Sequence, residues 1–416
     1  MKISFLGLGK LGLPLATNFA KNGHQTIAID KNQSLITKLN NGEVPWIETN
    51  LDTNLQKSNS YIEFTTSLEK VADTDATIIL VNTPSNKKDG SFSNLYVEEV
   101  IRDVAFELKK NNKKNHLFIL SSTVMPTSIN DNFIPLIESL NSWKVNEDFG
   151  FCYVPDFVAI GQVIFDFENP DFLLIGQTNS FYGDIVATLY SSIIKNNAKI
   201  INLTISEAEI CKVALNAYIT TKISFANYLG VLCEKLDSTI NIDNVTNTIG
   251  IDKRIGTKYF KSGASYGGTC FPRDTWAFMK ISKNLGLSAF QMEANEKIND
   301  LTDEFLINKI LQRKIKKIGL IGLGFKPGTS VVTEGLAIKL CKLLTARGYD
   351  IYMYDLLPDS FENISKEYDG DDILNCNSLE EIVTKTELIV ICNNDYAYSE
   401  LKNYTKNILD PWRIIK

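Results

Sequence analysis

The opening of the chain constrains its fold more than any other segment. An apolar run at residues 2–6 is followed at once by Gly7-Leu8-Gly9-Lys10-Leu11-Gly12, then by a helical stretch at 14–22 and a β-like run at 26–29 that ends at Asp30. Short buried strands alternating with a helix are typical of the βαβ unit of a parallel sheet. The sequence therefore predicts an α/β protein with a glycine turn at the carboxyl end of its first strand.

The glycine spacing predicts a site for a dinucleotide. Gly7 makes the tight turn, Gly9 lets backbone amides approach a pyrophosphate, and Gly12 lets helix and strand pack closely. Asp30 is expected to hold the ribose hydroxyls, and its charge disfavours the extra phosphate of NADP, so NAD is the expected cofactor. Glycines can also be simple turn residues, but the strand, helix and acid in register favour the binding interpretation.

A similar pattern recurs near the C-terminus. The run at 318–324 repeats the strand and glycine turn, and 352–355 again ends a β-like run at an aspartate. Between the two copies, residues 206–236 have helical spacing and no proline, which predicts one long helix. The expected fold is α/β, with two Rossmann-like, doubly wound parallel-sheet domains joined by a long central helix. In the second copy Pro327 takes the third glycine position, which favours a different phosphate ligand there.

Composition excludes several classes of function. With 416 residues and a net charge of −6, the chain is not suited to bind nucleic acid. Seven cysteines without a CxxC pair indicate neither a disulfide framework nor a zinc site, and we expect no metal. A signal sequence and an apolar run of bilayer length are both missing from the sequence, so we expect a cytoplasmic protein without a membrane partner.

Two further motifs carry candidate chemistry. In Gly267-Gly268-Thr269-Cys270-Phe271-Pro272-Arg273-Asp274, a cysteine lies in a glycine-bounded loop beside a cation and a carboxylate, which suits a nucleophilic thiolate. On local sequence alone an inert cysteine is the commoner case, and we assign the other six cysteines to packing. Lys212 and Asn216 share one face of the predicted helix and could stabilise an oxyanion, although a solvated helix face has the same spacing.

Together and in this order, these motifs resemble those of the UDP-glucose/GDP-mannose dehydrogenase family, the nucleotide-sugar 6-dehydrogenases. The resemblance covers essentially the whole chain, and 267–274 is similar to the family's GG-x-CF-x-KD signature. The supporting matches are Thr83-Pro84, Ser122-Thr123-Val124, Pro155-Asp156-Phe157, Asn169-Pro170-Asp171, Arg254-Ile255-Gly256 and Gly322-Leu323-Gly324-Phe325-Lys326-Pro327.

The resemblance implies an NAD-dependent enzyme that oxidises the primary alcohol of a nucleotide sugar, most often a UDP-sugar, to the carboxylate in two successive steps. Residues 1–200 would bind NAD, 201–300 would form a helical dimerisation segment carrying the catalytic Lys, Asn and Cys, and 301–416 would bind the nucleotide sugar. The expected assembly is a homodimer through the central helix.

The resemblance also implies roles for individual residues. Cys270 would capture the aldehyde as a thiohemiacetal and carry the thioester, while Lys212 and Asn216 would stabilise the oxyanions. Asp274 and Thr123 would position water and relay protons, and Asp156 stands where the family usually has a Glu. The cofactor would be held by Gly7, Gly9, Lys10, Leu11, Gly12, Asp30, Thr83, Pro84 and Thr123. The substrate would be held by Arg254, Lys258, Tyr259, Tyr266, Gly267, Phe271 and Lys326.

The departures from the family pattern concentrate on substrate recognition. Ile160 replaces a second Glu, Ser330-Val331-Val332-Thr333 replaces Asp-Asp-x-Arg, Ser265 replaces a glycine and Arg273 replaces a Lys. We therefore expect an active enzyme whose substrate differs from plain UDP-glucose.

Two alternatives remain open on the sequence. A two-electron 3-hydroxyacyl or 2-hydroxy-acid dehydrogenase would need a catalytic histidine in the middle of the chain, and no histidine follows His116. A nucleotide-sugar-binding homologue that has lost turnover is favoured by the missing Arg and Glu. The retained Lys212, Asn216, Cys270 and Asp274 oppose it.

Overall fold

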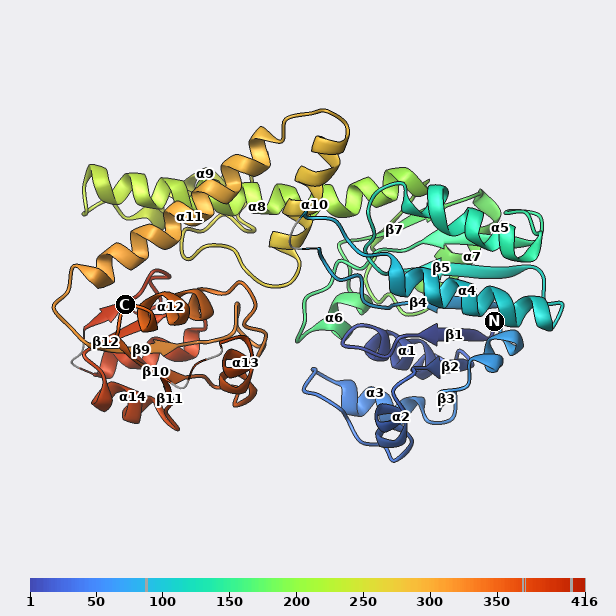
Figure 1. Ribbon diagram of the computed structural model, residues 1–416, viewed down its shortest axis with the longest axis horizontal. Helices are drawn as coiled ribbons and strands as arrows, with labels where there is room; N and C mark the ends of the chain where they lie inside the picture. The colour runs from blue at the N-terminus through green and yellow to red at the C-terminus, as the bar shows by residue number, and fades with distance from the viewer. Residues whose placement is uncertain (87–88, 369, 371, 405–406, 416) are drawn as a thin grey trace. The chain divides into compact units, whose positions relative to one another are not determined.

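The computed structural model describes residues 1–86, 89–368, 370, 372–404 and 407–415. The chain forms two compact units, Met1–Val213 and Ala214–Lys416 (Figure 1). Helix α8 (Ile205–Leu236) is a single helix of 32 residues that begins in the first unit and continues into the second. The predicted long helix is thereby confirmed, and it begins one residue earlier than expected.

The first unit is built on one eight-stranded sheet with the order β3-β2-β1-β4-β5-β6-β7-β8. Its neighbouring strands run parallel except for β6 and β7, so the expected parallel sheet contains one antiparallel pair. The strands are β1 (Ile3–Leu6), β2 (Thr26–Ile29), β3 (Ile62–Thr65), β4 (Ala76–Ile79), β5 (His116–Leu120), β6 (Phe149–Tyr153), β7 (Phe172–Gln177) and β8 (Lys199–Thr204).

Helices cover both faces of this sheet because its strands are apolar on both sides. Phe5 joins the core on one face and Leu6 the core on the other, as expected when successive side chains point to opposite faces. The first core includes residues of α1 (Gly12–Lys21), α2 (Gln33–Asn40), α3 (Leu51–Ser58), α6 (Val163–Glu168) and α7 (Ser180–Ser191). The second includes residues of η1 (Leu68–Asp73), α4 (Leu95–Lys110), η2 (Ile129–Phe133), α5 (Ile134–Asn141) and the start of α8.

The second unit combines helices with a smaller sheet of the order β11-β10-β9-β12-β13, in which all pairs are parallel. β9 lies between β10 and β12 as β1 lies between β2 and β4, so the predicted pair of Rossmann-like sheets is confirmed. The elements after α8 are α9 (Ile242–Ile251), α10 (Phe271–Asn284), α11 (Phe290–Leu311), β9 (Lys317–Ile321), α12 (Leu336–Thr345), β10 (Asp350–Tyr354), α13 (Asp359–Glu367), β11 (Ile373–Asn375), α14 (Leu379–Lys385), β12 (Leu388–Ile391), η3 (Tyr396–Asn403) and β13 (Ile408–Leu409).

The strand order determines where a ligand can bind. In each sheet the chain crosses to the opposite side of its first strand, and open α/β sheets bind their ligands at the carboxyl ends of the strands at such a point. None of the helices in the described part of the chain is long and apolar enough to span a bilayer.

A charged cluster ties together the helices on one face of the first sheet. Glu168 at the end of α6 is buried and pairs with Lys21 of α1 at 2.5 Å and with Lys195 at 2.6 Å. Burial alone would raise the pKa of Glu168, but the hydrogen bonds from Lys195 and Lys21 outweigh it and hold that pKa below its usual value. The ionised carboxylate therefore stabilises the fold.

We predict that Glu168→Gln lowers the free energy of unfolding at pH 7 by about 1–3 kcal/mol. Because the pKa of Glu168 is lower in the folded than in the unfolded state, the stabilisation is present above the unfolded value of 4.5 and is lost as the pH falls. Urea unfolding of both proteins at several pH values measures the difference. A gap between variant and wild type that widens in acid would contradict the prediction.

Candidate active site

The glycine turn after β1 is fixed by two close backbone approaches. Gly7 has a φ of +95°, and a Cβ at this position would lie 2.2 Å from the carbonyl oxygen of Leu80. A Cβ at Gly12 would lie 1.9 Å from the carbonyl oxygen of Gly7. Both positions therefore require glycine for packing, as the sequence analysis expects.

Gly9 differs from its two neighbours because its surroundings are open. A Cβ at Gly9 would meet none of the described atoms within 4 Å, and both Gly9 and Lys10 are exposed. Leu11 stands at the N-cap of α1 and has no capping side chain, so the first amides of the helix are not capped from there. An open glycine at the N-terminus of a helix suits a pyrophosphate, which fits the expected NAD.

Asp30 holds the glycine turn from the end of β2. Its Oδ2 accepts a hydrogen bond from the amide of Leu8 at 2.8 Å, and its Oδ1 accepts one from the amide of Asn32 at 2.9 Å. In the second unit Asp355 accepts hydrogen bonds from the amides of Leu323 and Leu357 at 2.5 and 2.8 Å. The two turns are thus built alike. A carboxylate has about four acceptor positions, so Asp30 can still accept from ribose hydroxyls.

The loops after β4 and β5 bring together two residues predicted to bind the cofactor. The hydroxyl of Thr83, which is buried, donates to the carbonyl oxygen of Thr123 at 2.7 Å. Ser122 links the same two loops, because its hydroxyl accepts from the amide of Val81 at 2.9 Å and donates to the Val81 carbonyl at 2.7 Å. Thr123 is partly exposed and Pro84 is exposed, at the edge of the sheet where β1 also ends.

The loop after β6 holds Asp156 beside Lys212 of α8. The Lys212 ammonium donates to the backbone carbonyl of Asp156 at 2.5 Å and lies 4.7 Å from the ring centroid of Phe157. The Oδ2 atom of Asp156 is buried and has no hydrogen-bond partner among the described residues. Burial raises the pKa of Asp156 to about 7, although the nearby Lys212 charge lowers it. A carboxyl group with such a pKa is suited to exchange protons near neutral pH.

In the second unit, Asn216 contacts the predicted catalytic loop. Its side-chain amide donates to Oδ2 of Asp274 at 2.5 Å, and Asp274 is fully buried. The guanidinium of Arg273 donates to the other oxygen of Asp274 at 3.2 Å. Residues that are 58 positions apart are thereby joined, and the orientation of the Asp274 carboxylate is fixed.

Cys270 is exposed and stands at the N-cap of α10. The positive end of a helix favours negative charge there. Thr269 lies beside it, with the hydroxyl 3.6 Å from the sulfur atom. Five of the other six cysteines are buried, as expected for packing, whereas Cys211 on α8 is exposed in the single chain.

The predicted substrate-binding residues have different surroundings. Tyr259 has a φ of +61°, rare for a bulky residue, and its ring meets that of Phe271 edge-on at 5.8 Å. Arg254 is exposed and paired with Asp252 at 2.6 Å, and Lys258 is also exposed. Tyr266 is buried, and its hydroxyl donates to Glu296 of α11.

The cysteine loop packs against the segment between β9 and α12 at three points. The amide of Gly268 donates to the carbonyl of Thr333 at 2.9 Å, and a Cβ at Gly267 would lie 2.2 Å from the carbonyl oxygen of Glu334. Gly268 has a φ of +84° and faces the ring of Phe325, beside the predicted Lys326. The roles of Thr333 and Glu334 depend on backbone atoms, so their residue types could not reveal them. Phe325 belongs to the family motif, but its residue type alone does not predict a contact with Gly268.

Both histidines form hydrogen bonds outside these loops. His116 is fully buried and hydrogen-bonded to Thr77 at 2.7 Å, and burial lowers its pKa to about 3. His24 lies 2.7 Å from the hydroxyl of Ser192, and burial lowers its pKa as well. Neither is placed to act as the base of a hydroxy-acid dehydrogenase. Among the described residues no group of three or more His, Cys, Asp or Glu could hold a metal ion.

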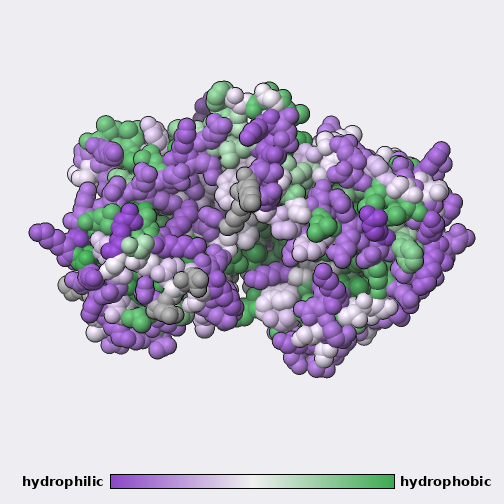
Figure 2. Space-filling model, viewed as in Figure 1, coloured by the Kyte–Doolittle hydropathy of each residue, from purple (hydrophilic) through white to green (hydrophobic). Residues whose placement is uncertain are grey.

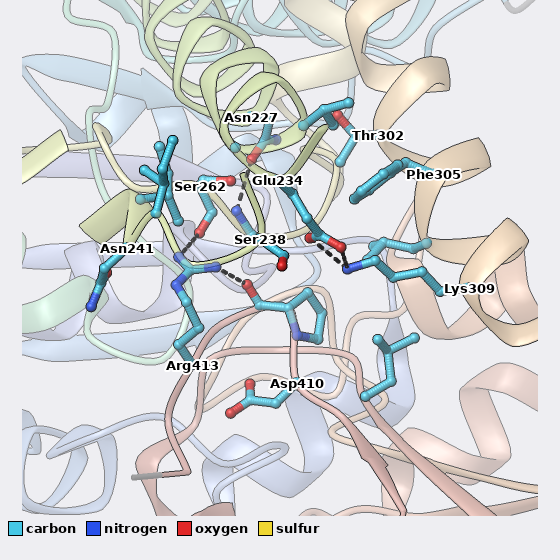
Figure 3. Close-up of a pocket in the computed structure, with 18 residues that line it drawn as sticks. Asn227, Glu234, Ser238, Asn241, Ser262, Thr302, Phe305, Lys309, Asp410 and Arg413 are labelled. Carbon is cyan, nitrogen blue, oxygen red and sulfur yellow. Dashed lines mark hydrogen bonds and ion pairs between the residues drawn. The ribbon is translucent and has the colours of Figure 1, made fainter. Parts of the chain in front are cut away.

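A cavity of about 280 Å³ lies in the second unit, away from the predicted residues (Figure 3). Residues of α8 and α11 line it together with the segment at 409–413. Figure 3 shows three of its charged groups engaged: Lys309 pairs with Glu234 at 2.5 Å, and Arg413 donates to the carbonyl of Ser262 at 2.6 Å. None of the predicted site residues is among its lining residues, so we do not assign this cavity to the reaction.

Three family models match consecutive parts of the chain. They describe the NAD binding domain (residues 1–194), the central domain (206–301) and the UDP binding domain (319–416) of the UDP-glucose/GDP-mannose dehydrogenase family. The chain belongs to this family. It is therefore an NAD-dependent nucleotide-sugar dehydrogenase, which confirms the expected family, fold, enzyme class and cofactor.

Individual members of the family are similar over nearly their whole length. A GDP-mannose 6-dehydrogenase of Pseudomonas aeruginosa is 29% identical, covering 97% of this chain and 94% of the relative. A UDP-glucose 6-dehydrogenase of Rickettsia bellii is 31% identical, covering 94% of this chain and 88% of the relative. The solved structure of a UDP-glucose dehydrogenase from Pyrobaculum islandicum is 29% identical, with a TM-score of 0.91, covering 100% of this chain and 95% of that one.

The two glycines of the NAD turn should respond differently to alanine. We expect Gly9→Ala to keep the wild-type melting temperature and to weaken NAD binding about tenfold or more, because its methyl group enters the open space that the pyrophosphate needs. Gly12→Ala should lower the free energy of unfolding by about 1–3 kcal/mol, because its methyl group meets the Gly7 carbonyl. Thermal unfolding and NADH fluorescence titration test both, and equal behaviour of the two variants would contradict this reading.

Proposed function

We propose that this dehydrogenase oxidises the primary alcohol of a nucleotide sugar to the carboxylate in two steps, through a covalent intermediate on Cys270. The proposal rests on the exposure and the surroundings of Cys270. It is exposed at a helix N-terminus, in a loop held by Gly267 and Gly268, four residues before a buried aspartate that Asn216 orients. An inert packing cysteine would be buried.

The chemistry follows from the need to oxidise an aldehyde by hydride loss. NAD, when bound, accepts the hydride in each oxidation. The Cys270 thiolate adds to the aldehyde to give a thiohemiacetal, which keeps the substrate on the enzyme between the two steps. Loss of the second hydride leaves a thioester, and water hydrolyses it to the carboxylate and the free thiol.

The other predicted catalytic residues supply charge and protons. We assign stabilisation of the oxyanions to the Lys212 ammonium and the Asn216 amide. Asp274 and Thr123 position water and relay protons. Asp156 is the carboxyl group suited to take a proton near pH 7, since burial raises its pKa to about 7.

We assign NAD to residues 1–200 and the nucleotide sugar to 301–416. Residues 201–300 are assigned as the helical dimerisation segment that carries the catalytic Lys, Asn and Cys. A UDP-sugar is the proposed substrate, in line with the UDP binding domain that matches 319–416. The substrate is proposed to differ from UDP-glucose, in its sugar or in its nucleotide, because Ile160 and Thr333 stand where the family has a Glu and an Arg. The Thr333 hydroxyl instead donates to Glu367 at 2.5 Å.

We also propose a homodimer through α8. Three large apolar side chains recur every seven residues along this helix and are exposed in the single chain: Tyr218 by 65%, Phe225 by 50% and Leu232 by 40%. Seven residues are close to two helical turns, so the three lie on one side of the helix. Such a stripe on a long helix is suited to pack against its own copy.

The function is tested by counting products. With NAD and a panel of UDP-, GDP- and CDP-sugars, we expect two NADH per sugar acid formed and the highest kcat/KM with a UDP-sugar. One NADH per product would indicate a two-electron dehydrogenase. Sugar binding without NADH would indicate a homologue that has lost turnover.

Cys270→Ser should lower kcat for acid formation by about 100-fold or more, because a serine hydroxyl is a much weaker nucleophile than a thiolate. Cys211→Ser is the matched control, since Cys211 is the other exposed cysteine. We expect this control to keep the wild-type kcat. Unchanged steady-state turnover of Cys270→Ser would defeat the proposed role of the thiol.

For the dimer, the double variant Phe225→Asp/Leu232→Asp should give a monomer at concentrations where the wild type is a dimer, because two charges would be buried without partners. Light scattering after size exclusion measures the mass. Leu287→Asp is the control, because Leu287 is exposed in the turn between α10 and α11. Exposed apolar side chains also occur elsewhere on the surface, as the green areas of Figure 2 show. Dissociation of the control, or a dimer of the α8 variant, would reject the α8 interface.

A further inference from the structure

The first turns of α8 hold two loops of the first unit at the carboxyl ends of neighbouring strands. Ser206 accepts a hydrogen bond from Asn130 at 3.1 Å, and Lys212 donates to the loop after β6. Between these two lies Glu209, to which neither the family motifs nor the sequence analysis assigns a role. Its contacts concern the segment at residues 121–129, which follows β5 and contains Thr123; we call it the β5 loop.

Glu209 binds the β5 loop through both of its carboxylate oxygens. Oε2 accepts a hydrogen bond from the amide of Thr127 at 2.7 Å, and Oε1 accepts one from the amide of Ile129 at 3.1 Å. The Glu209 side chain is fully buried. Thr127 has a φ of +76°, so the β5 loop is bent here in a way that a threonine does not favour by itself. The two hydrogen bonds hold this bend in place.

The same loop is fixed at its other end beside the predicted cofactor residues. The carbonyl of Thr123 accepts the hydroxyl of Thr83, and Val124 is fully buried in the core between the sheet and α8. A loop that is anchored at Thr123 and again at Thr127 has little freedom between these points. The position of the Thr123 hydroxyl is therefore set in part by Glu209.

The buried Glu209 carboxylate lowers the free energy of unfolding. Burial raises its pKa to about 7, although the amides of Ile129 and Thr127 lower it, and the nearby carboxylate of Asp131 raises it further. Because this pKa is higher in the folded than in the unfolded state, the free energy of unfolding falls as the pH rises from 4.5 to about 7 and stays at the lower value above that pH. Stability alone does not explain a carboxylate here, so its value must lie in the loop geometry.

We propose that Glu209 is a positioning residue for the dehydrogenase reaction, which holds the β5 loop so that Thr123 takes its place in proton transfer. The inference rests on the role proposed above for Thr123. Glu209 itself does not touch substrate or cofactor. It acts through two backbone amides, four and six residues beyond Thr123.

The test is a double-mutant cycle on kcat/KM with Glu209→Gln and Thr123→Val. Glutamine keeps the size of the side chain but presents an NH₂ group to one of the two amides. We expect Glu209→Gln alone to lower kcat/KM about tenfold or more, as small misplacements at a reacting centre do. In the Thr123→Val background the same change should cost less than about twofold, because the group that it displaces is already gone.

Two controls separate this role from a general structural one. Glu207→Gln lies on the same helix, where Glu207 is exposed and bonded to Thr204, and it should keep the wild-type kcat/KM. Glu209→Gln should keep its free energy of unfolding at pH 8 within about 1 kcal/mol, since the buried charge is removed together with one hydrogen bond. If Glu209→Gln does not fold, Glu209→Asp takes its place, with the charge kept and the reach shortened.

The outcomes are distinguishable. Wild-type kcat/KM in Thr123→Val rejects the proposed role of Thr123 and with it the path from Glu209. A loss in Thr123→Val combined with no loss in Glu209→Gln rejects the inference alone. Equal losses from Glu209→Gln in both backgrounds also reject it, because they would mean that Glu209 acts independently of Thr123.

Discussion

The parallel pairing of β1 with β2 on one side and β4 on the other is the constraint on which the first unit depends. It places the carboxyl ends of these strands, and of β5 and β6 beyond them, along one edge of the sheet. The glycine turn, Asp30, Thr83, Thr123 and Asp156 each follow one of these five strands, so residues far apart in the sequence are gathered at one edge. The chemistry of the individual loops can then vary while the edge is kept by the strand core.

Helix α8 is the second structural feature that positions the site residues. Its start is buried in the core between the sheet and α4, through Ile205 and Ala208, and this fixes the helix against the loops after β5 and β6. One face then carries groups in sequence: Glu209 toward the β5 loop, Lys212 toward Asp156, and Asn216 toward Asp274. The same helix thereby contributes side chains to each of the two units.

Much of this could be predicted from residue types and spacing. The glycine turn and Asp30 could be predicted because these positions require a particular residue type. Gly7 and Gly12 have no room for a Cβ, and Asp30 carries the required charge. The long helix followed from periodicity. The features that could not be predicted depend on backbone atoms, or on the direction in which a strand enters the sheet. The Thr333 carbonyl that receives Gly268 has no residue signature, and β6 and β7 look like any other buried strands although they pair antiparallel.

Glu209 was missed for a related reason. In a helix with mixed apolar and polar positions, one glutamate reads as a solvated side chain, and only the tertiary structure reveals that it is fully buried. Asp156 and Glu209 share this property: each is a carboxyl group whose pKa burial raises to about 7. Both lie at the edge where the glycine turn ends, next to loops that carry predicted catalytic residues. For Asp156 the raised pKa suits proton exchange near neutral pH, whereas Glu209 acts through the loop that it holds. A fold selected for stability alone would replace both carboxyl groups with apolar side chains.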